Sequence, residues 1–171
     1  MVVERVKSPR VCSPEEIAAF LALLKRREEV RDDNLCRRMT RARSLAFHYE
    51  NGTLAGIIAL KKASRAYLKK IETLARWRNS IGVRYEVGWA YVLEEYRNRG
   101  IASTLLDLLL SANRDIPTFS VTKTANQPVR SMLRKHGYVR CGSPYLWHGC
   151  KAVLYARPAR CDDDAPSRND S

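Results

Sequence analysis

The sequence is short of acidic residues compared with basic ones. Its 171 residues contain 18 Asp and Glu against 31 Lys and Arg, which leaves a formal net charge of +13. A field of this sign favours anionic partners such as a polyphosphate cofactor, nucleic acid or an acidic surface. Charge alone does not choose among these partners.

Paired cysteines and histidine clusters are also lacking. The five cysteines are scattered and form no C-x-x-C pair, and there are only three histidines. Spacings typical of zinc ligands or of a disulfide framework are therefore absent. We expect a reduced protein that uses no metal.

Long apolar runs are missing too. No stretch approaches the roughly 18 residues of a membrane span, and residues 1–10 lack the apolar core of a signal peptide. These absences predict a cytoplasmic protein with no membrane contact. The length suits one domain over residues 1–157. The polar, acidic-tipped segment 158–171 is predicted to be disordered.

The rest of the chain alternates between helical and strand patterns. A capping box from Ser13 to Glu16 starts a first helix, and a second is expected over 33–43. Asn51-Gly52 closes a hairpin between strands 45–50 and 53–60. Further strands are predicted over 2–6, 85–93, 117–122, 138–141 and 151–156, with helices over 103–110 and 126–137. This order predicts an α/β (α+β) fold, a mixed sheet with helices on its faces.

Residues 61–82 form a strongly basic segment with seven cations and one acid. Tyr67 and Trp77 are interleaved among them at near-helical spacing. A helical connection with a buried apolar face and a solvated basic face explains this pattern. The alternative is a substrate-facing flap whose basic, aromatic surface meets nucleic acid. We favour the first interpretation, because amphipathic spacing accounts for the aromatics without a ligand.

A strand, a glycine-bearing turn and a helix meet at Arg97-Asn98-Arg99-Gly100-Ile101-Ala102. This arrangement points backbone N–H groups and the positive end of a helix at an anion. Gly100 lets the backbone approach a ligand closely, and the small Ala102 does not obstruct it. The motif predicts a phosphate-binding turn. An ordinary strand-to-helix turn with a solvated arginine pair is the alternative.

Two motifs together resemble those of the GNAT superfamily of acetyl-CoA-dependent N-acyltransferases. The first is Arg or Gln, two residues, Gly, one residue, then Gly or Ala, which stands here as Arg97 to Ala102. The second is an Asn opening a helix that closes about eleven residues later on Gly plus an aromatic. Asn126 and Gly137-Tyr138 match it. The resemblance covers residues 45–155 and implies a mixed, mostly antiparallel central sheet with helices on both faces.

The resemblance also implies acetyl-CoA as co-substrate. The turn would hold its pyrophosphate through backbone N–H groups of Arg97, Asn98, Arg99, Gly100, Ile101 and Ala102. In this family the central strands splay apart, so that Tyr91 and Val92 would bind the pantetheine arm like an added strand. The Val92 N–H would then polarise the thioester carbonyl. Asn126 resembles the family's asparagine near the pantetheine.

Acyl transfer to an amine requires a proton acceptor, because a lysine-like amine has a pKa of ~10.4 and must be neutral to attack. Several family members use a glutamate on the central strand. Counting back from the turn without gaps, Glu86 falls at that position. The alternative role for Glu86 is a strand-edge carboxylate that pairs with local arginines.

The family's usual general acid is missing from this chain. Many relatives carry a tyrosine four residues before the Gly of the second motif, and Leu133 stands there instead. The thiolate then leaves unassisted, which its pKa of ~8.5 allows, or another hydroxyl serves. Tyr145 and Tyr155 are the candidates, because they lie in strands that line the family's acceptor side.

The sequence thus predicts an N-acetyltransferase that moves an acetyl group from acetyl-CoA to a primary amine by direct attack on the thioester. The acceptor is left open among a small amine, a protein amine and an amine carried on nucleic acid. The alternative is an inactive module of the same fold that binds coenzyme A or nucleic acid. The oligomeric state is also left open, a dimer included.

Overall fold

The computed structural model describes residues 1–26 and 34–159. The predicted tail therefore lies almost wholly outside the described residues. Within the described ranges, no helix is long and apolar enough to cross a membrane. The elements are β1 (Val2–Lys7), η1 (Pro9–Val11), α1 (Pro14–Lys25), α2 (Leu35–Met39), β2 (Ser44–Glu50), β3 (Thr53–Lys62), α3 (Arg65–Ala75), β4 (Tyr85–Val92), η2 (Glu94–Tyr96), α4 (Ile101–Ser111), β5 (Thr118–Lys123), α5 (Gln127–Lys135), β6 (Val139–Trp147) and β7 (Cys150–Arg157).

The strands form one seven-stranded sheet in the order β1-β2-β3-β4-β5-β7-β6. Every neighbouring pair is antiparallel except β4 and β5, which are parallel. That parallel pair is joined only at Tyr85–Thr118 and Glu86–Phe119, although both strands continue. The predicted mixed, mostly antiparallel sheet is confirmed, and so is the splaying of its central strands.

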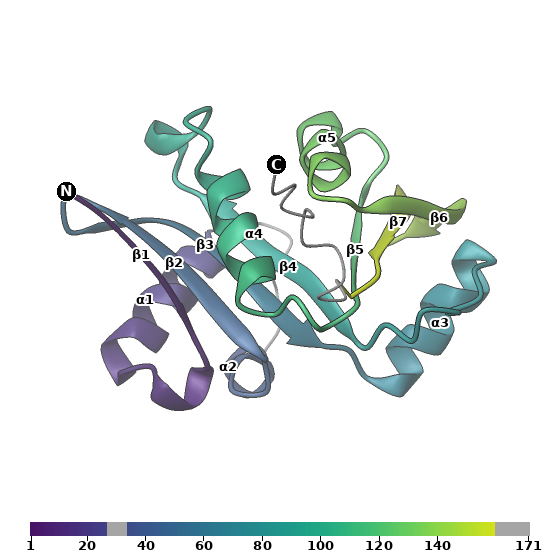
Figure 1. Ribbon diagram of the computed structural model, residues 1–171, viewed down its shortest axis with the longest axis horizontal. Helices are drawn as coiled ribbons and strands as arrows, with labels where there is room; N and C mark the ends of the chain where they lie inside the picture. Colours follow the sequence, from purple (N-terminus) through teal and green to yellow (C-terminus); the bar gives the residue numbers. More distant parts are fainter. Residues whose placement is uncertain (27–33, 160–171) are drawn as a thin grey trace, which may run out of the picture.

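Helices cover both faces of the sheet, as predicted (Figure 1). Alternate residues of β3 show this division. Ile58 and Leu60 pack in the hydrophobic cluster that contains Leu105 of α4. Ile57 packs in the cluster on the opposite face, which contains Phe20 of α1. A third cluster lies beneath α3, so that α1, α2 and α3 share one face and α4 and α5 the other.

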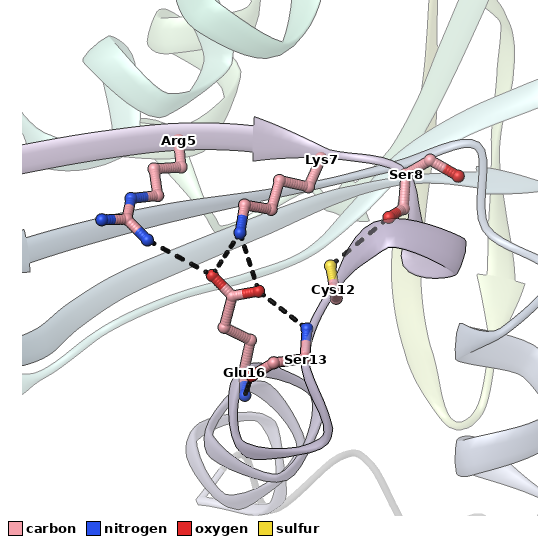
Figure 2. Close-up of polar contacts among 6 residues, drawn as sticks. All are labelled: Arg5, Lys7, Ser8, Cys12, Ser13 and Glu16. Carbon is pink, nitrogen blue, oxygen red and sulfur yellow. Dashed lines mark hydrogen bonds and ion pairs between the residues drawn. The ribbon is translucent and has the colours of Figure 1, made fainter.

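The capping box at the start of α1 is confirmed. The Glu16 N–H donates to the Ser13 hydroxyl at 3.2 Å, and the Ser13 N–H donates to the Glu16 carboxylate at 2.9 Å. The same carboxylate lies 2.7 Å from the Lys7 ammonium and 3.5 Å from the Arg5 guanidinium of β1 (Figure 2). These contacts, with the Lys7 hydrogen bond first, lower the pKa of Glu16. One side chain thus caps α1 and ties it to the edge strand.

The second predicted helix is shorter than expected. Residue 33 lies outside the described residues, and α2 ends at Met39 rather than at 43. The Arg41 and Ala42 N–H groups bond to carbonyls three residues back, which tightens the chain into a turn. The Arg43 N–H then donates to the Leu60 carbonyl at 2.8 Å and leads the chain into β2.

Strand β6 is longer than the predicted 138–141, because it resumes after a bulge and runs to Trp147. The interruption contains Gly142, which has a φ of +63°. A Cβ at this position would collide with the Ala75 carbonyl oxygen at the end of α3. Glycine therefore allows β6 to pass close to α3, and the resumed strand places Tyr145 and Trp147 on the α3 side.

Arg65–Ala75 of the basic segment forms α3, so the predicted helix is confirmed, and contact of its basic surface with nucleic acid stays a prediction. Ile71 and Ala75 are buried, while Arg65, Lys69 and Arg76 are exposed. The helix starts at a Ser64 cap and packs against β6. Figure 1 shows α1 and α3 near opposite ends of the sheet.

Candidate active site

The turn before α4 has the backbone geometry of an anion site. Gly100 is left-handed with a φ of +78°, and Asn98 is left-handed with a φ of +62°. α4 begins directly afterwards at Ile101, and no side chain caps it. The first-turn N–H groups of an α-helix have no partner within the helix, and they point out of its N-terminal end. Ile101 and Ala102 supply such groups here.

The two arginines of the turn, Arg97 and Arg99, stabilise it through contacts with other protein groups. Arg97 donates to the Val92 carbonyl at 3.2 Å and pairs with Glu94 at 3.2 Å. Arg99 pairs with Glu50 of β2 at 3.3 Å. Their charges remain at the turn, but their side chains are engaged by protein groups. The backbone of the turn therefore offers the more direct contacts to an anion.

The backbone of Val92 faces away from β3. The Leu93 N–H donates to the Ala55 carbonyl at 2.9 Å, and Val92 lies opposite Gly56 in the same ladder. Bonded and non-bonded pairs alternate along an antiparallel ladder. The Val92–Gly56 pair is thus of the non-bonded kind, and the Val92 N–H and C=O point toward the side on which β5 diverges.

Tyr91 and Asn126 lie on the two segments that flank this divergence. The Arg97 guanidinium lies 5.8 Å from the centre of the Tyr91 ring. Asn126 caps α5 by accepting the Val129 N–H at 3.3 Å on its side-chain oxygen. Asn126 therefore has a structural role at the start of α5.

Glu86 is a buried carboxylate, 8% exposed, at the last residue pair that joins β4 to β5. Its Oε2 atom lies 2.9 Å from the Nζ atom of Lys61, the residue opposite it on β3. The Lys61 ammonium also lies 5.3 Å from the centre of the Trp89 ring. Gly88 leaves room for it, since a Cβ there would stand 2.9 Å from Nζ. The ion pair is with a lysine rather than with the arginines expected for a structural role.

Tyr145 brings an unpaired hydroxyl to the same place. It is 6% exposed, and its oxygen has no hydrogen-bond partner among the described residues. Burial, aided by the negative charge of Glu86, raises the pKa of Tyr145 to about 12. Burial likewise raises the pKa of Tyr67, with Glu86 and Tyr145 contributing. Groups from α3, β4 and β6 therefore share one site.

Aromatic rings form one wall of this site. The Trp147 ring centre lies 5.8 Å from that of Tyr67 and 6.2 Å from that of Tyr145, both in edge-on contact. The ammonium of Lys70, on α3, lies 4.9 Å from the centre of the same Trp147 ring. A buried carboxylate, an unpaired hydroxyl and an aromatic wall can together bind an amine and accept its proton.

Comparison with known families identifies the chain. The model of the Acetyltransferase (GNAT) family matches residues 13–138. The chain belongs to this family. As a GNAT protein it is an acyl-CoA-dependent N-acyltransferase, and acyl-CoA is its co-substrate.

Solved structures of GNAT proteins share the fold at low sequence identity. An acyl-CoA N-acyltransferase from Pseudomonas aeruginosa is 15% identical with a TM-score of 0.70, over 92% of this chain and 99% of the other. FeeM, an N-acyl amino acid synthase from uncultured soil microbes, is 16% identical with a TM-score of 0.68, over 93% and 91%. Ard1 from Thermoplasma volcanium is 19% identical with a TM-score of 0.65, over 94% and 99%. No curated protein sequence matches this GNAT chain.

The second candidate acid of this GNAT protein, Tyr155, lies on the other face of the sheet. It packs in the α4 and α5 cluster, together with Leu133. Its hydroxyl is 3.3 Å from the Arg130 Nε atom, which donates to it. Tyr145 instead packs in the α3 cluster. The fold therefore brings Tyr145 to Glu86 and places Tyr155 elsewhere.

The sequence did not predict three side chains that the structure places at this candidate site, namely Lys61, Tyr67 and Trp147. Lys61 and Tyr67 had been noted only as parts of a basic amphipathic segment. The register of β3 against β4 is the signal that would have paired Lys61 with Glu86. Trp147 lies in the half of β6 that the sequence did not predict.

Proposed function

We propose that this GNAT protein transfers an acetyl group from acetyl-CoA to a primary amine, which attacks the thioester directly. One observation carries the proposal. The buried Glu86 carboxylate and the unpartnered Tyr145 hydroxyl share a site at the point where β4 and β5 diverge. A carboxylate can accept the proton of the amine, and a buried O–H can donate to negative charge that develops on the leaving group.

The coenzyme would lie along the end of β4. The left-handed Gly100 and the uncapped start of α4 suit its pyrophosphate, which the N–H groups of Ile101 and Ala102 would bind. Arg97, Asn98 and Arg99 complete the turn. The Val92 backbone, directed away from β3, suits the pantetheine arm, flanked by Tyr91 and by Asn126. The thioester would then reach back along β4 toward Glu86.

The chemistry follows from these positions. The amine loses a proton to Glu86, its nitrogen bonds to the thioester carbon, and the carbon–sulfur bond breaks. Tyr145 has a pKa raised to about 12, so its hydroxyl keeps its proton at neutral pH. Because the thiol has a pKa of ~8.5, complete transfer of that proton to sulfur is uphill. Tyr145 therefore acts by donating a hydrogen bond to the thiolate, and solvent supplies the proton.

Two measurements test this function. Thermal melting with acetyl-CoA at about 100 times its dissociation constant should show roughly 2.7 kcal/mol of added stability. A transfer screen with free thiol as readout should then find an acceptor among small amines, peptides and nucleic acids. No melting shift would overturn the coenzyme proposal. A shift without thiol release in any arm would favour the inactive binding module.

The surface charge favours an acceptor amine carried on nucleic acid. Arg65, Lys69, Arg76 and Arg84 are all exposed around α3, and within the described part of the chain none forms an ion pair. Phosphates that neutralise such cations release counterions, so binding weakens steeply with salt. The KM of a nucleic-acid acceptor should therefore rise with salt. An insensitive KM, or turnover of small amines alone, would contradict this acceptor class.

A further inference from the structure

The proposed base of this enzyme already holds an amine of the protein itself. The Nζ atom of Lys61 lies 2.9 Å from Oε2 of Glu86. A primary amine at hydrogen-bond distance from the proton acceptor is the arrangement that an acceptor substrate must reach. Lys61 therefore occupies the place of the nucleophile.

Lys61 is more enclosed by the protein than a surface lysine. Its side chain is 13% exposed, and its ammonium lies across Gly88 and near the Trp89 ring on β4. Trp89 has a φ of +53° and belongs to the irregular stretch of β4, where the register with β3 shifts. A pantetheine arm that runs back from Val92 along β4 brings its thioester toward this stretch. The neighbouring Lys62, by contrast, is exposed.

We propose that the enzyme acetylates its own Lys61 when acetyl-CoA is bound. This inference rests on the proposed function. The Lys61 ammonium gives one proton to Glu86, and the neutral nitrogen attacks the thioester carbon. A carbon–nitrogen bond forms and the carbon–sulfur bond breaks. The products are acetylated Lys61, the thiol of coenzyme A and one proton, so that no further reactant is needed.

Acetylation would change the site as well as the residue. An amide carries no positive charge and cannot form the ion pair with Glu86. The carboxylate would then be available to an incoming ammonium, which otherwise has to displace Lys61. The modified enzyme should therefore bind its amine acceptor more readily than the unmodified enzyme, and acceptor turnover should begin with a lag that pre-incubation with acetyl-CoA removes.

Mass spectrometry of the full chain with acetyl-CoA tests the proposal directly. Lys61 should gain one acetyl group at a first-order rate that does not depend on protein concentration. Its rate should exceed that of Lys62, and Glu86→Gln should lower the Lys61 rate about 100-fold or more while leaving Lys62 unchanged. Lys62→Arg is the matched control and should leave Lys61 acetylation intact. In chain unfolded by urea, the two lysines should react at similar rates.

Three results would overturn the inference. They are equal acetylation of Lys61 and Lys62 in the folded chain, persistence of the Lys61 rate in a folded Glu86→Gln, and an unmodified Lys61 during active turnover of an acceptor. The last result would leave the proposed function standing. Absence of an acetyl-CoA melting shift would instead remove the proposed function. Because the comparison of folded and unfolded wild-type chain needs no variant, the test survives if Glu86→Gln fails to fold.

Discussion

The two faces of the sheet each bury a tyrosine hydroxyl, and they treat it differently. On the α4 and α5 face, the Tyr138 oxygen lies 2.7 Å from the Thr118 hydroxyl. On the α3 face, the Tyr145 oxygen has no partner among the described residues. Burial is the largest cause in both cases, and it raises each pKa to about 12. The two hydroxyls are thus buried to a similar extent, but only that of Tyr138 has a hydrogen-bond partner among the described residues.

The difference distinguishes the α4 and α5 face, where the tyrosine hydroxyl is paired, from the α3 face, which carries the proposed site. After the end of α4, the buried Asn113 is also paired, because its amide nitrogen donates to the Leu109 carbonyl at 2.8 Å and to the Ser44 hydroxyl at 3.2 Å. A buried hydroxyl without a partner costs free energy on folding. Its retention at Tyr145 is understandable if a ligand supplies the missing partner.

Among the variants that test this comparison, Glu86→Gln is expected to have the largest effect. The turnover number should fall by roughly 10²- to 10⁴-fold, because the amide cannot accept the amine proton. Coenzyme A affinity should stay nearly constant, since Glu86 is not expected to touch the coenzyme. Steady-state kinetics and coenzyme binding measure the two quantities, with Glu72→Gln on α3 as the control. Unchanged turnover would remove Glu86 from the mechanism.

The next effect is expected from Tyr145→Phe. Losing a hydrogen bond to a charged group costs about 1.5–3 kcal/mol, so turnover should fall roughly 10- to 100-fold. The melting temperature should stay level or rise, because the hydroxyl has no protein partner to lose. A variant that loses stability and keeps its turnover number would place Tyr145 among the structural tyrosines.

Tyr138→Phe should show the opposite pattern. It leaves the buried Thr118 hydroxyl without its 2.7 Å partner, which should lower the free energy of unfolding by about 1–2 kcal/mol. Turnover per folded molecule should not change. Urea denaturation and kinetics on the same sample measure both, and a selective loss of turnover would contradict the assignment of the two faces.

The smallest effect is expected from Glu16→Gln, which removes a carboxylate paired with a lysine but far from the site. The introduced amide can still accept the Ser13 N–H, so the variant loses only the charge contacts with Lys7 and Arg5, which should cost about 1 kcal/mol or less at neutral pH. Since the folded-state pKa of Glu16 is lowered, its contribution is present above the unfolded pKa and disappears as pH falls through the folded value. Urea denaturation at pH 7 and pH 3 should therefore show the variant and wild type converging in acid, with turnover unaffected.

Local signals in the sequence predicted most of the fold. The capping box at Ser13, the Asn51-Gly52 hairpin and the turn at Gly100 each depend on residues near one another in the chain, and each is present. The second half of β6 was missed, because Gly142-Ser143-Pro144 looks like the end of a strand. Only the contact with α3 shows that it is a bulge.

The site depended on information that the sequence does not display. Glu86 and Tyr145 were predicted through the family resemblance, and the structure places them together. Lys61 meets Glu86 only through the register between two strands. Tyr67 was hidden because its helical spacing is equally typical of a core residue.

The short parallel junction in the sheet has a mechanical consequence. With only Tyr85–Thr118 and Glu86–Phe119 paired across it, the sheet consists of two antiparallel ribbons, β1 to β4 and β5 to β7, joined by a narrow seam. Local opening is favoured where few backbone hydrogen bonds must break. A coenzyme arm lying along the open part of that seam would contact both ribbons and hold them together. Amide hydrogen exchange in β5 should then slow when the coenzyme is bound. The two ribbons would open as one cooperative unit only in the presence of the co-substrate.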